Sequence, residues 1–226
     1  MTSPAISTTT RLQSAALQPR PHDLLWLADA AALMPLTLAP LPCWASAEWI
    51  MAAPVVVRRQ KLDDPTLLPV GLRGRERNQR LASFVLRDAI RRYVSPEMLA
   101  QSADSPSELP ALQALAMARP LLDALGLAWG PTGGVGFALA TGLPVLHATS
   151  DLDLVLRAAA PLDSSQRDHL AALLHCTACR IDLQIDTGLG GFSFAEWMAG
   201  RGHVLLKTDT GPLLVRDPWK QAMQSA

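Results

Sequence analysis

Cysteine, tyrosine and lysine are scarce in this chain of 226 residues, which has three cysteines, one tyrosine and three lysines. Residues 1–20 are rich in Ser and Thr and lack the apolar core of a secretory signal. An odd number of cysteines without such a signal argues against a disulfide framework, so we expect reduced thiols in a cytoplasmic protein. Cys176 and Cys179 have the spacing of half a zinc site, but a second pair of ligands at a clear spacing is missing, and we expect no zinc there.

Long apolar runs and net charge are also lacking. No stretch of about 20 uninterrupted apolar residues occurs, which argues against a membrane-spanning helix. The 20 basic and 20 acidic residues cancel, so no overall field directs the chain to nucleic acid or to a membrane. We expect neither of them as a partner.

The basic residues are nevertheless concentrated in one stretch. Between Val55 and Arg92 there are ten Arg or Lys and four Asp or Glu, an excess of six positive charges. Because the planar guanidinium group binds phosphate bidentately, this excess indicates a phosphate-rich substrate or an acidic partner protein. The ordinary alternative is a solvated, charged surface.

Within this stretch, Arg58, Arg73 and Arg75 are the candidates for contact with substrate phosphates. Arg73 and Arg75 are favoured because neighbouring glycines let that backbone approach a ligand closely. The interval 75–93 has a partly apolar helical face, and on that helix Arg87 and Arg91 would lie one turn apart. We expect this second pair to face an acidic partner protein.

Composition and breaker residues divide the chain into three parts. An apolar fraction of 49% and a charged fraction of 18% are ordinary for a globular protein. Pro96 and the Ser- and Pro-containing cluster at 102–108 mark the expected domain boundary. We expect a disordered leader at 1–20, an N-terminal lobe for substrate or partner at 21–105, and a catalytic domain at 106–226.

Periodicity and turn residues predict an alternation of helices and strands. A helix capped by Asp23 is expected from Leu24 onward, and Ser164 or Ser165 is expected to cap the helix at 166–177. The other predicted helices lie at 44–50, 75–93, 109–125, from 133 onward, and 194–198. Pro120 makes the segment at 109–125 either two helices or one kinked helix. The predicted strands lie at 53–59, 67–74, 127–129, 151–156 and 180–186, with a hairpin at 204–207 and 212–215.

The most informative stretch is 129–156, where a glycine-rich turn precedes an Asp-x-Asp strand. Asp151 and Asp153 alternate with leucines, so both carboxylates lie on one face, about 7 Å apart. Two like charges held this close normally need a cation, and Mg²⁺ (or Mn²⁺) suits oxygen ligands and substrate phosphates. A solvated sheet face is the alternative, and metal-dependent glycosyltransferases also use Asp-x-Asp.

A third carboxylate is expected from the next strand. Asp182 has the same apolar flanks, and neighbouring strands lie about 4.8 Å apart, so an aligned Asp182 would join the first two around the metal. Asp186 is the second choice for this ligand. Gly133 and Gly134 are expected to let the start of a helix approach a phosphate, with Thr132 as the helix cap.

These motifs resemble two nested groups of proteins. Gly133-Gly134 opening a helix, followed by Asp151-x-Asp153 on a strand, is the site pattern of nucleotidyltransferases related to DNA polymerase β. The longer stretch, from Trp129-Gly-Pro-Thr-Gly-Gly to Ser150-Asp-Leu-Asp-Leu154, resembles the phosphoribosyl-dephospho-CoA transferases, also called malonate decarboxylase holo-acyl-carrier-protein synthases.

The resemblance implies an α/β (α+β) protein with a C-terminal mixed sheet of nucleotidyltransferase type and a smaller N-terminal lobe. It implies transfer of a dephospho-CoA-derived prosthetic group from a triphosphoribosyl-dephospho-CoA donor to a serine of the acyl carrier protein subunit of malonate decarboxylase, with release of diphosphate. Asp151, Asp153 and Asp182 would be both catalytic residues and metal ligands. The alternatives are a nucleotidyltransferase that modifies a small molecule or a protein, and a non-enzymatic module that binds a carrier protein.

Overall fold

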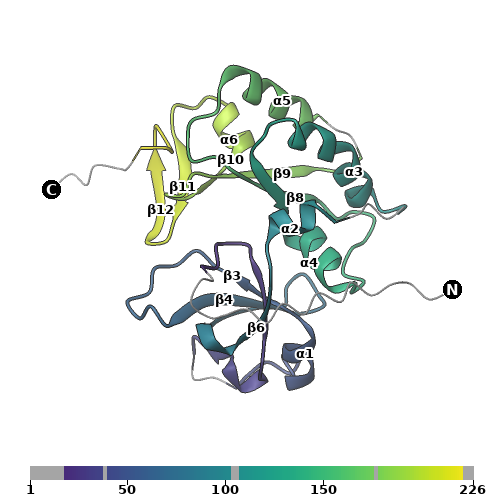
Figure 1. Cartoon of the computed structure of the whole chain (residues 1–226), viewed down its shortest axis with the longest axis vertical. Coiled ribbons are helices and arrows are strands. Elements are labelled where there is room, and N and C mark those ends of the chain that lie inside the picture. Colours follow the sequence, from purple (N-terminus) through teal and green to yellow (C-terminus); the bar gives the residue numbers. More distant parts are fainter. Residues whose placement is uncertain (1–17, 38–39, 103–106, 176–177, 221–226) are drawn as a thin grey trace.

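The computed structural model describes residues 18–37, 40–102, 107–175 and 178–220. Two β-sheets with flanking helices build two domains, one above the other in Figure 1. The α/β class expected from the sequence is confirmed. Most of the predicted leader and the predicted boundary between residues 105 and 106 lie outside the described residues.

The first domain is an antiparallel sheet with the strand order β2-β5-β4-β3-β1-β6. Helix α1 packs beside β1 and begins at an N-cap, Ser46, whose hydroxyl accepts from the Trp49 N–H. The predicted segments at 44–50, 53–59 and 67–74 are confirmed as a helix and two strands. The strands and the helix are β1 (Leu24–Leu27), β2 (Met34–Pro35), α1 (Ala47–Ala52), β3 (Val55–Val57), β4 (Leu67–Arg73), β5 (Arg80–Leu86) and β6 (Ile90–Val94).

The helix predicted from Leu24 onward is wrong, because these residues form strand β1. Strand β1 pairs with β3 and β6, and both of its faces are buried. Leu25 and Leu27 join the core of the first domain, whereas Leu24 and Trp26 pack toward the second domain. A strand buried on both faces has no alternation of apolar and polar residues to reveal it. Asp23 caps no helix; its carboxylate accepts from the Arg20 backbone N–H at 2.7 Å.

The helix predicted over 75–93 is also wrong. Residues 80–86 form β5, which pairs with β4 from Leu67↔Leu86 to Arg73↔Arg80, and residues 90–94 form β6. Pairing along the whole of β4 outweighs the helical spacing of the local sequence, since strand propensity depends strongly on tertiary context. Arg87 lies in a short 3₁₀ turn (Arg87–Ala89) and Arg91 on β6, so they are not on one helix.

The second domain is a mixed sheet in the order β12-β11-β10-β9-β8-β7, in which β8 and β9 run parallel. Its helices and strands include the predicted central strands, the helix over 109–125 as a single helix with Pro120 inside, and the C-terminal hairpin. Their bounds are α2 (Pro96–Ala100), α3 (Pro110–Asp123), β7 (Ala128–Pro131), α4 (Gly133–Thr141), β8 (Leu152–Arg157), α5 (Ser164–Leu174), β9 (Ile181–Asp186), β10 (Gly191–Ser193), α6 (Phe194–Met198), β11 (Val204–Thr208) and β12 (Gly211–Val215).

One helix start in this domain differs from the expectation. Asp163, rather than Ser164 or Ser165, is the N-cap of α5. Its carboxylate accepts from the Gln166 N–H, and the Gln166 side chain accepts from the Asp163 N–H, which makes a capping box. The two serines that follow Asp163 lie inside the first turn.

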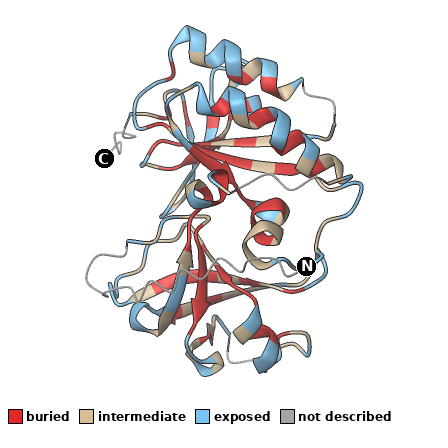
Figure 2. Ribbon diagram, turned by 45° about the vertical axis from the view of Figure 1, so that its right-hand side comes forward, coloured by how far each residue is buried: buried red, intermediate tan, exposed pale blue. Residues whose placement is uncertain are grey.

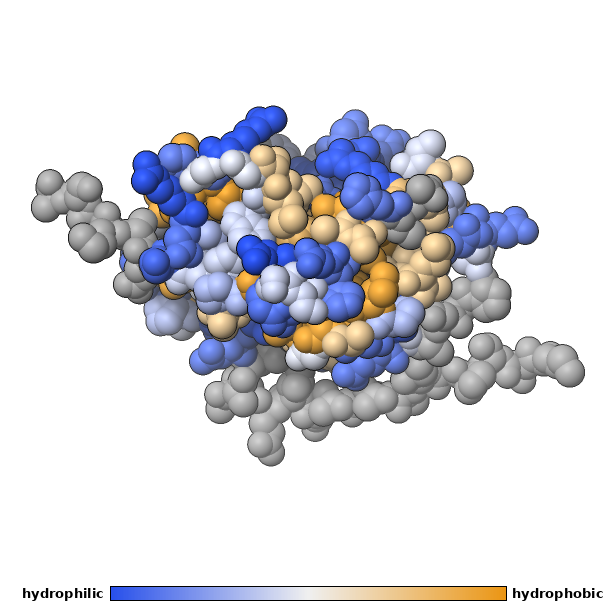
Figure 3. Space-filling model, turned by 90° about the horizontal axis from the view of Figure 1, so that it is seen from above, coloured by the Kyte–Doolittle hydropathy of each residue, from blue (hydrophilic) through white to orange (hydrophobic). Residues whose placement is uncertain are grey.

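The two faces of the second sheet have different surroundings. Helices α3, α5 and α6 lie on the side away from the first domain, and Leu154 and Leu183 belong to the core on that sheet. The opposite face, on which Asp153 and Asp182 lie, is turned to the first domain (Figure 1). Burial therefore concentrates within each sheet and at the junction of the domains (Figure 2). The outer, helical side mixes hydrophilic and apolar patches (Figure 3).

Helix α4 lies between the two domains. Val135 is fully buried in the core of the second domain, and Phe137, 1% exposed, is buried in the core of the first. The helix ends at Gly142, which has a φ of 71° and so adopts the left-handed conformation that favours glycine. Within the described part of the chain, no helix combines the length and apolarity needed to cross a membrane.

Candidate active site

The predicted carboxylates come together at the start of β8 and β9. Asp153 and Asp182 are directly paired neighbours in the parallel register of these strands, which is the alignment that the sequence analysis expected of a third ligand. Asp151 lies two residues before Asp153, just outside β8. The side chain of Asp182 is 48% exposed, and its closest cation is Arg180 at 3.8 Å.

Asp153 lies at a partly buried position beside the other two carboxylates. Burial, followed by the charges of Asp182 and Asp151, raises the pKa of Asp153 above its ordinary value. Arg77 and a hydrogen bond from the Gly134 N–H oppose this shift. Three carboxylates that repel one another at a partly buried position form the kind of site that a cation stabilises.

The glycine-rich turn fits closely against Asp153. Gly133 has a φ of 54°, and a Cβ built on it would overlap the carboxylate oxygen Oδ2 of Asp153. A Cβ on Gly134 would instead meet the flexible end of Leu146 at 3.2 Å. The Thr132 N–H donates to the Asp153 carbonyl at 2.8 Å, which ties the turn to the strand. Gly133 is therefore the glycine that this arrangement requires.

The N-terminus of α4 lacks a side-chain cap from its N-cap residue. Thr132 is its N-cap residue, but the predicted capping bond is missing, because its side chain makes no hydrogen bond to the first turn. Backbone N–H groups at a helix N-terminus attract anions when they lack such a cap. One of these groups, the Gly134 N–H, donates to the Asp153 carboxylate, so the helix N-terminus lies directly beside this site.

A cavity of about 350 Å³ lies next to this turn, between the two domains. Thr132, Gly133 and Phe137 line it from the second domain. Arg58, Arg73 and Arg80 line it from the first domain. Burial and the charge of Arg80 lower the pKa of Arg73, and Asp153 raises it, so this arginine is electrostatically coupled to the carboxylate site.

Arg75, the remaining predicted phosphate contact, does not line this cavity. It lies in the turn after β4, with its guanidinium 5.0 Å from the centre of the Trp49 ring. Arg87 and Arg91 are turned to backbone carbonyls, Pro65 at 2.7 Å and Met51 at 2.8 Å respectively. Arg80 was grouped with the basic stretch in the sequence, and only the hairpin between β4 and β5 places it opposite Arg73.

Comparison with known proteins decides the family. The model of the phosphoribosyl-dephospho-CoA transferase MdcG N-terminal domain matches residues 20–96, and that of the C-terminal domain matches residues 98–218. The chain belongs to the phosphoribosyl-dephospho-CoA transferase family. It is a transferase, and the family resemblance stated from its motifs is confirmed.

Relatives named phosphoribosyl-dephospho-CoA transferase align with almost the whole chain. One from Pseudomonas putida (strain GB-1) is 47% identical over 208 residues, covering 92% of this chain and 98% of the relative. One from Azotobacter vinelandii is 44% identical over 214 residues, covering 91% and 96%. One from Klebsiella pneumoniae (strain 342) is 43% identical over 206 residues, covering 89% and 96%. A search of solved structures found no match.

His22 is a residue of this transferase that the sequence analysis did not single out. It lines the cavity and has a φ of 80°, which is uncommon for a residue other than glycine. Burial lowers the pKa of His22 to about 4, although a hydrogen bond to Gln184 opposes the shift. The ring Nε2 donates to Gln184 Oε1 at 2.6 Å, since an amide oxygen only accepts. A neutral, oriented imidazole therefore joins the two domains.

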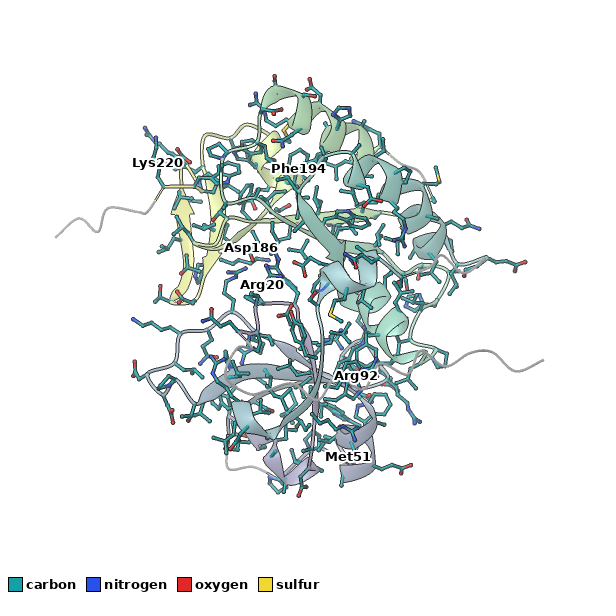
Figure 4. All side chains as sticks on the ribbon, in the orientation of Figure 1. Arg20, Met51, Arg92, Asp186, Phe194 and Lys220 are labelled. Carbon is teal, nitrogen blue, oxygen red and sulfur yellow. The ribbon has the colours of Figure 1, made fainter. Side chains whose placement is uncertain are left out.

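Asp186, the second choice for the third carboxylate, is engaged elsewhere in this transferase. Its Oδ2 lies 3.0 Å from Arg59 and 2.5 Å from Arg157, and its side chain is 8% exposed. Burial opposes ionisation, but Arg59, the Gly188 N–H and Arg157 outweigh it and hold the pKa of Asp186 below its ordinary value. Arg157 also pairs with Glu97, and Arg20 reaches the same Glu97. Figure 4 shows Asp186 and Arg20 at the junction of the domains.

These two environments predict opposite results for the two candidate ligands. Asp182→Asn is expected to leave the free energy of unfolding within about 0.5 kcal/mol, because its side chain is half exposed, yet to lower the transfer rate strongly. Asp186→Asn is expected to lower the free energy of unfolding by up to about 3 kcal/mol, because Arg59 and Arg157, both largely buried, lose a carboxylate partner. Urea unfolding and a transfer assay on both variants check this. If Asp186→Asn were stable but inactive, Asp186 rather than Asp182 would be the ligand.

The pH dependence gives a further check on Asp186. A carboxylate with a lowered folded pKa contributes stability above its unfolded pKa, near 4, and loses it as the pH falls through the folded pKa. The stability difference between the wild type and Asp186→Asn should therefore be full at neutral pH and shrink in acid below about pH 4.

The carboxylates fit magnesium as donors, although the chain alone does not complete a metal site. Among the described residues, no three or more His, Cys, Asp or Glu side chains are gathered closely enough to hold a metal ion. Mg²⁺ is commonly bound by one or two carboxylates and completed by substrate phosphates and water. The mutual repulsion at Asp153 is the observation that favours a cation there. Cys176, half of the cysteine pair, lies outside the described residues.

Proposed function

We propose that the protein transfers the 2′-(5″-phosphoribosyl)-3′-dephospho-CoA group from its triphosphate precursor to a serine of the acyl carrier protein subunit of malonate decarboxylase. The serine oxygen forms a bond to the α-phosphorus of the donor, the bond to the leaving diphosphate breaks, and the serine proton passes to a base. The observation that carries the proposal is the pairing of Asp153 with Asp182 beside the N-terminus of α4, in a chain of this transferase family.

The chain's own residues supply binding, orientation and a base. Arg73 and Arg80 lie across the domain junction from Asp153 and carry the positive charge that a triphosphate needs. Other N–H groups at the start of α4 add donors for the same anion. Asp182, whose side chain is 48% exposed, would accept the proton of an incoming serine hydroxyl.

Magnesium would be held by one or two of the carboxylates of Asp151, Asp153 and Asp182, and donor phosphate oxygens and water would complete its coordination. When bound it would neutralise the charge that develops on the attacking and leaving oxygens. Positively charged arginines on one side and carboxylates on the other then enclose the triphosphate between the domains. This arrangement agrees with the preference of ligand sites for domain interfaces.

The size of the transferred group tests the function directly. The carrier protein is co-expressed with the wild type or with Asp153→Asn and analysed by intact-protein mass spectrometry. We expect the wild type to add one phosphoribosyl-dephospho-CoA unit at a single serine, and Asp153→Asn to add none. A mass gain equal to an ordinary nucleotide would identify a nucleotidyltransferase with another donor. An unmodified carrier with both forms of the enzyme would overturn the proposal.

A further inference from the structure

The interdomain cavity has a composition that the transfer chemistry alone does not explain. Most of its wall is apolar and comes from the strands of the first domain and from α4. Under the proposed function the triphosphate lies at the polar edge, beside Gly133, which leaves the apolar part to another portion of the donor. The side chains that provide this apolar wall are Leu24, Val56, Leu72, Leu81, Leu99 and Phe137.

The charged part of the cavity favours an anion. Arg58, Arg73 and Arg80 line it, and none of the described lining residues is Asp or Glu. The Nη1 atom of Arg58 and the Nε atom of Arg73 are buried without a hydrogen-bond partner. A buried donor without a partner costs about 1–3 kcal/mol, and a bound anion would remove that cost.

Comparison with Arg59 shows that the missing hydrogen-bond partner of Arg58 depends on where its side chain lies. Arg59 follows Arg58 in sequence but is turned to the Asp186 carboxylate at 3.0 Å. Arg58 instead extends over Gly71 on β4, where a Cβ on Gly71 would lie 3.5 Å from Arg58 Cδ. The chain thus pairs one guanidinium with a carboxylate and leaves the other beside the cavity without one.

We infer that this cavity binds the nucleoside diphosphate portion of the donor, with the adenine ring against the apolar wall and its 5′-diphosphate on Arg58. This inference rests on the proposed function for the identity of the donor. A flat aromatic ring that carries a diphosphate matches an apolar wall beside unpaired guanidinium groups. A volume of about 350 Å³ falls within the range of small-molecule sites. The first domain is then the part that recognises the coenzyme end of the donor.

Binding of adenosine 5′-diphosphate to the full chain, measured by calorimetry in the absence of carrier protein, tests the inference. Arg58→Ala is expected to weaken the affinity at least about tenfold, the loss of one charged hydrogen bond. Arg216→Ala removes the same charge from the exposed end of the C-terminal hairpin and should change the affinity less than twofold.

A second variant separates the ring from the phosphates. Leu81→Ala removes apolar surface from the wall at a partly buried position of β5. It should weaken adenosine 5′-diphosphate several-fold more than it weakens inorganic diphosphate. Circular dichroism and thermal melting of each variant show that it is folded, and Arg58→Ala alone tests the site if Leu81→Ala does not fold.

The outcomes are distinguishable from those of the transfer assay. Adenosine 5′-diphosphate affinity that neither variant changes would overturn the inference even if the carrier gains the full mass. The inference would also be overturned if pantetheine, titrated in the same way, bound the full chain and adenosine 5′-diphosphate did not. Arg58→Ala could lose affinity for adenosine 5′-diphosphate while the wild type leaves the carrier protein unmodified. That pair of results would uphold the cavity as a nucleotide site and overturn the proposed function.

Discussion

Asp153→Asn is expected to lower the transfer rate by about 10²–10³-fold or more without destabilising the protein. The loss follows because Asp153 lies at the centre of the carboxylate site, and removing one group that stabilises developing charge typically costs that much. Rates measured at saturating donor and carrier check this. Asp168→Asn, an exposed aspartate on α5, is the matched control and should keep full activity.

The stability of Asp153→Asn has a definite sign. Since burial and two neighbouring carboxylates raise the folded pKa of Asp153, stability is lost as the pH rises from the unfolded pKa, near 4, to the folded pKa, and the full cost is present above it. Asparagine removes this cost, so the melting temperature at pH 7 without metal should be equal to that of the wild type or higher. Added magnesium should stabilise the wild type more than the variant. A variant that melts lower and responds equally to magnesium would contradict the placement of the cation.

Gly133→Ala is expected to inactivate the enzyme nearly as completely, through displacement of Asp153. A left-handed conformation costs an L-residue about 1–2 kcal/mol, and the added methyl group would also overlap Asp153 Oδ2. We expect at least about a hundredfold loss of transfer rate, because small misplacements of a reacting group have effects of that size. Steady-state kinetics measure the transfer rate of the variant, and urea unfolding measures its free energy of unfolding.

The other end of the same helix offers the control. Gly142 has a φ of 71°, and a Cβ built on it meets nothing within 4 Å. Gly142→Ala should therefore lose a similar amount of stability but keep its activity. Gly134→Ala should have a smaller effect on rate than Gly133→Ala, since its new methyl group meets the flexible ends of Leu146, at 3.2 Å, and of Arg73, at 3.7 Å, rather than Asp153. Equal inactivation by Gly133→Ala and Gly142→Ala would assign the loss to helix stability.

The sequence predicts the centre of the site better than its surroundings. Alternation of leucine with aspartate marks β8 and β9, and their shared flanks predict the neighbouring positions of Asp153 and Asp182. These strands have one apolar and one polar face, which is the pattern that sequence reading detects. The roles of these carboxylates and glycines remain predictions that the experiments above address.

The first domain was harder to predict, for physical reasons. Strand β1 is buried on both faces, and β5 carries residues whose spacing also fits a helix, so local pattern gives no correct answer for either. Pairing with neighbouring strands of the sheet determines that both segments are strands. His22 and Arg80 reach the cavity only because these strands bring them there, and the backbone conformation of His22 leaves no trace in its residue type.

Helix α4 also has a consequence for how the protein unfolds. Val135 is seated in one hydrophobic core and Phe137, two residues later, in the other. Melting either domain would expose one of these side chains and free the helix that holds the glycine turn. Although two family models divide the chain, heat should therefore unfold it in a single cooperative transition, and neither half expressed alone should be a stable protein.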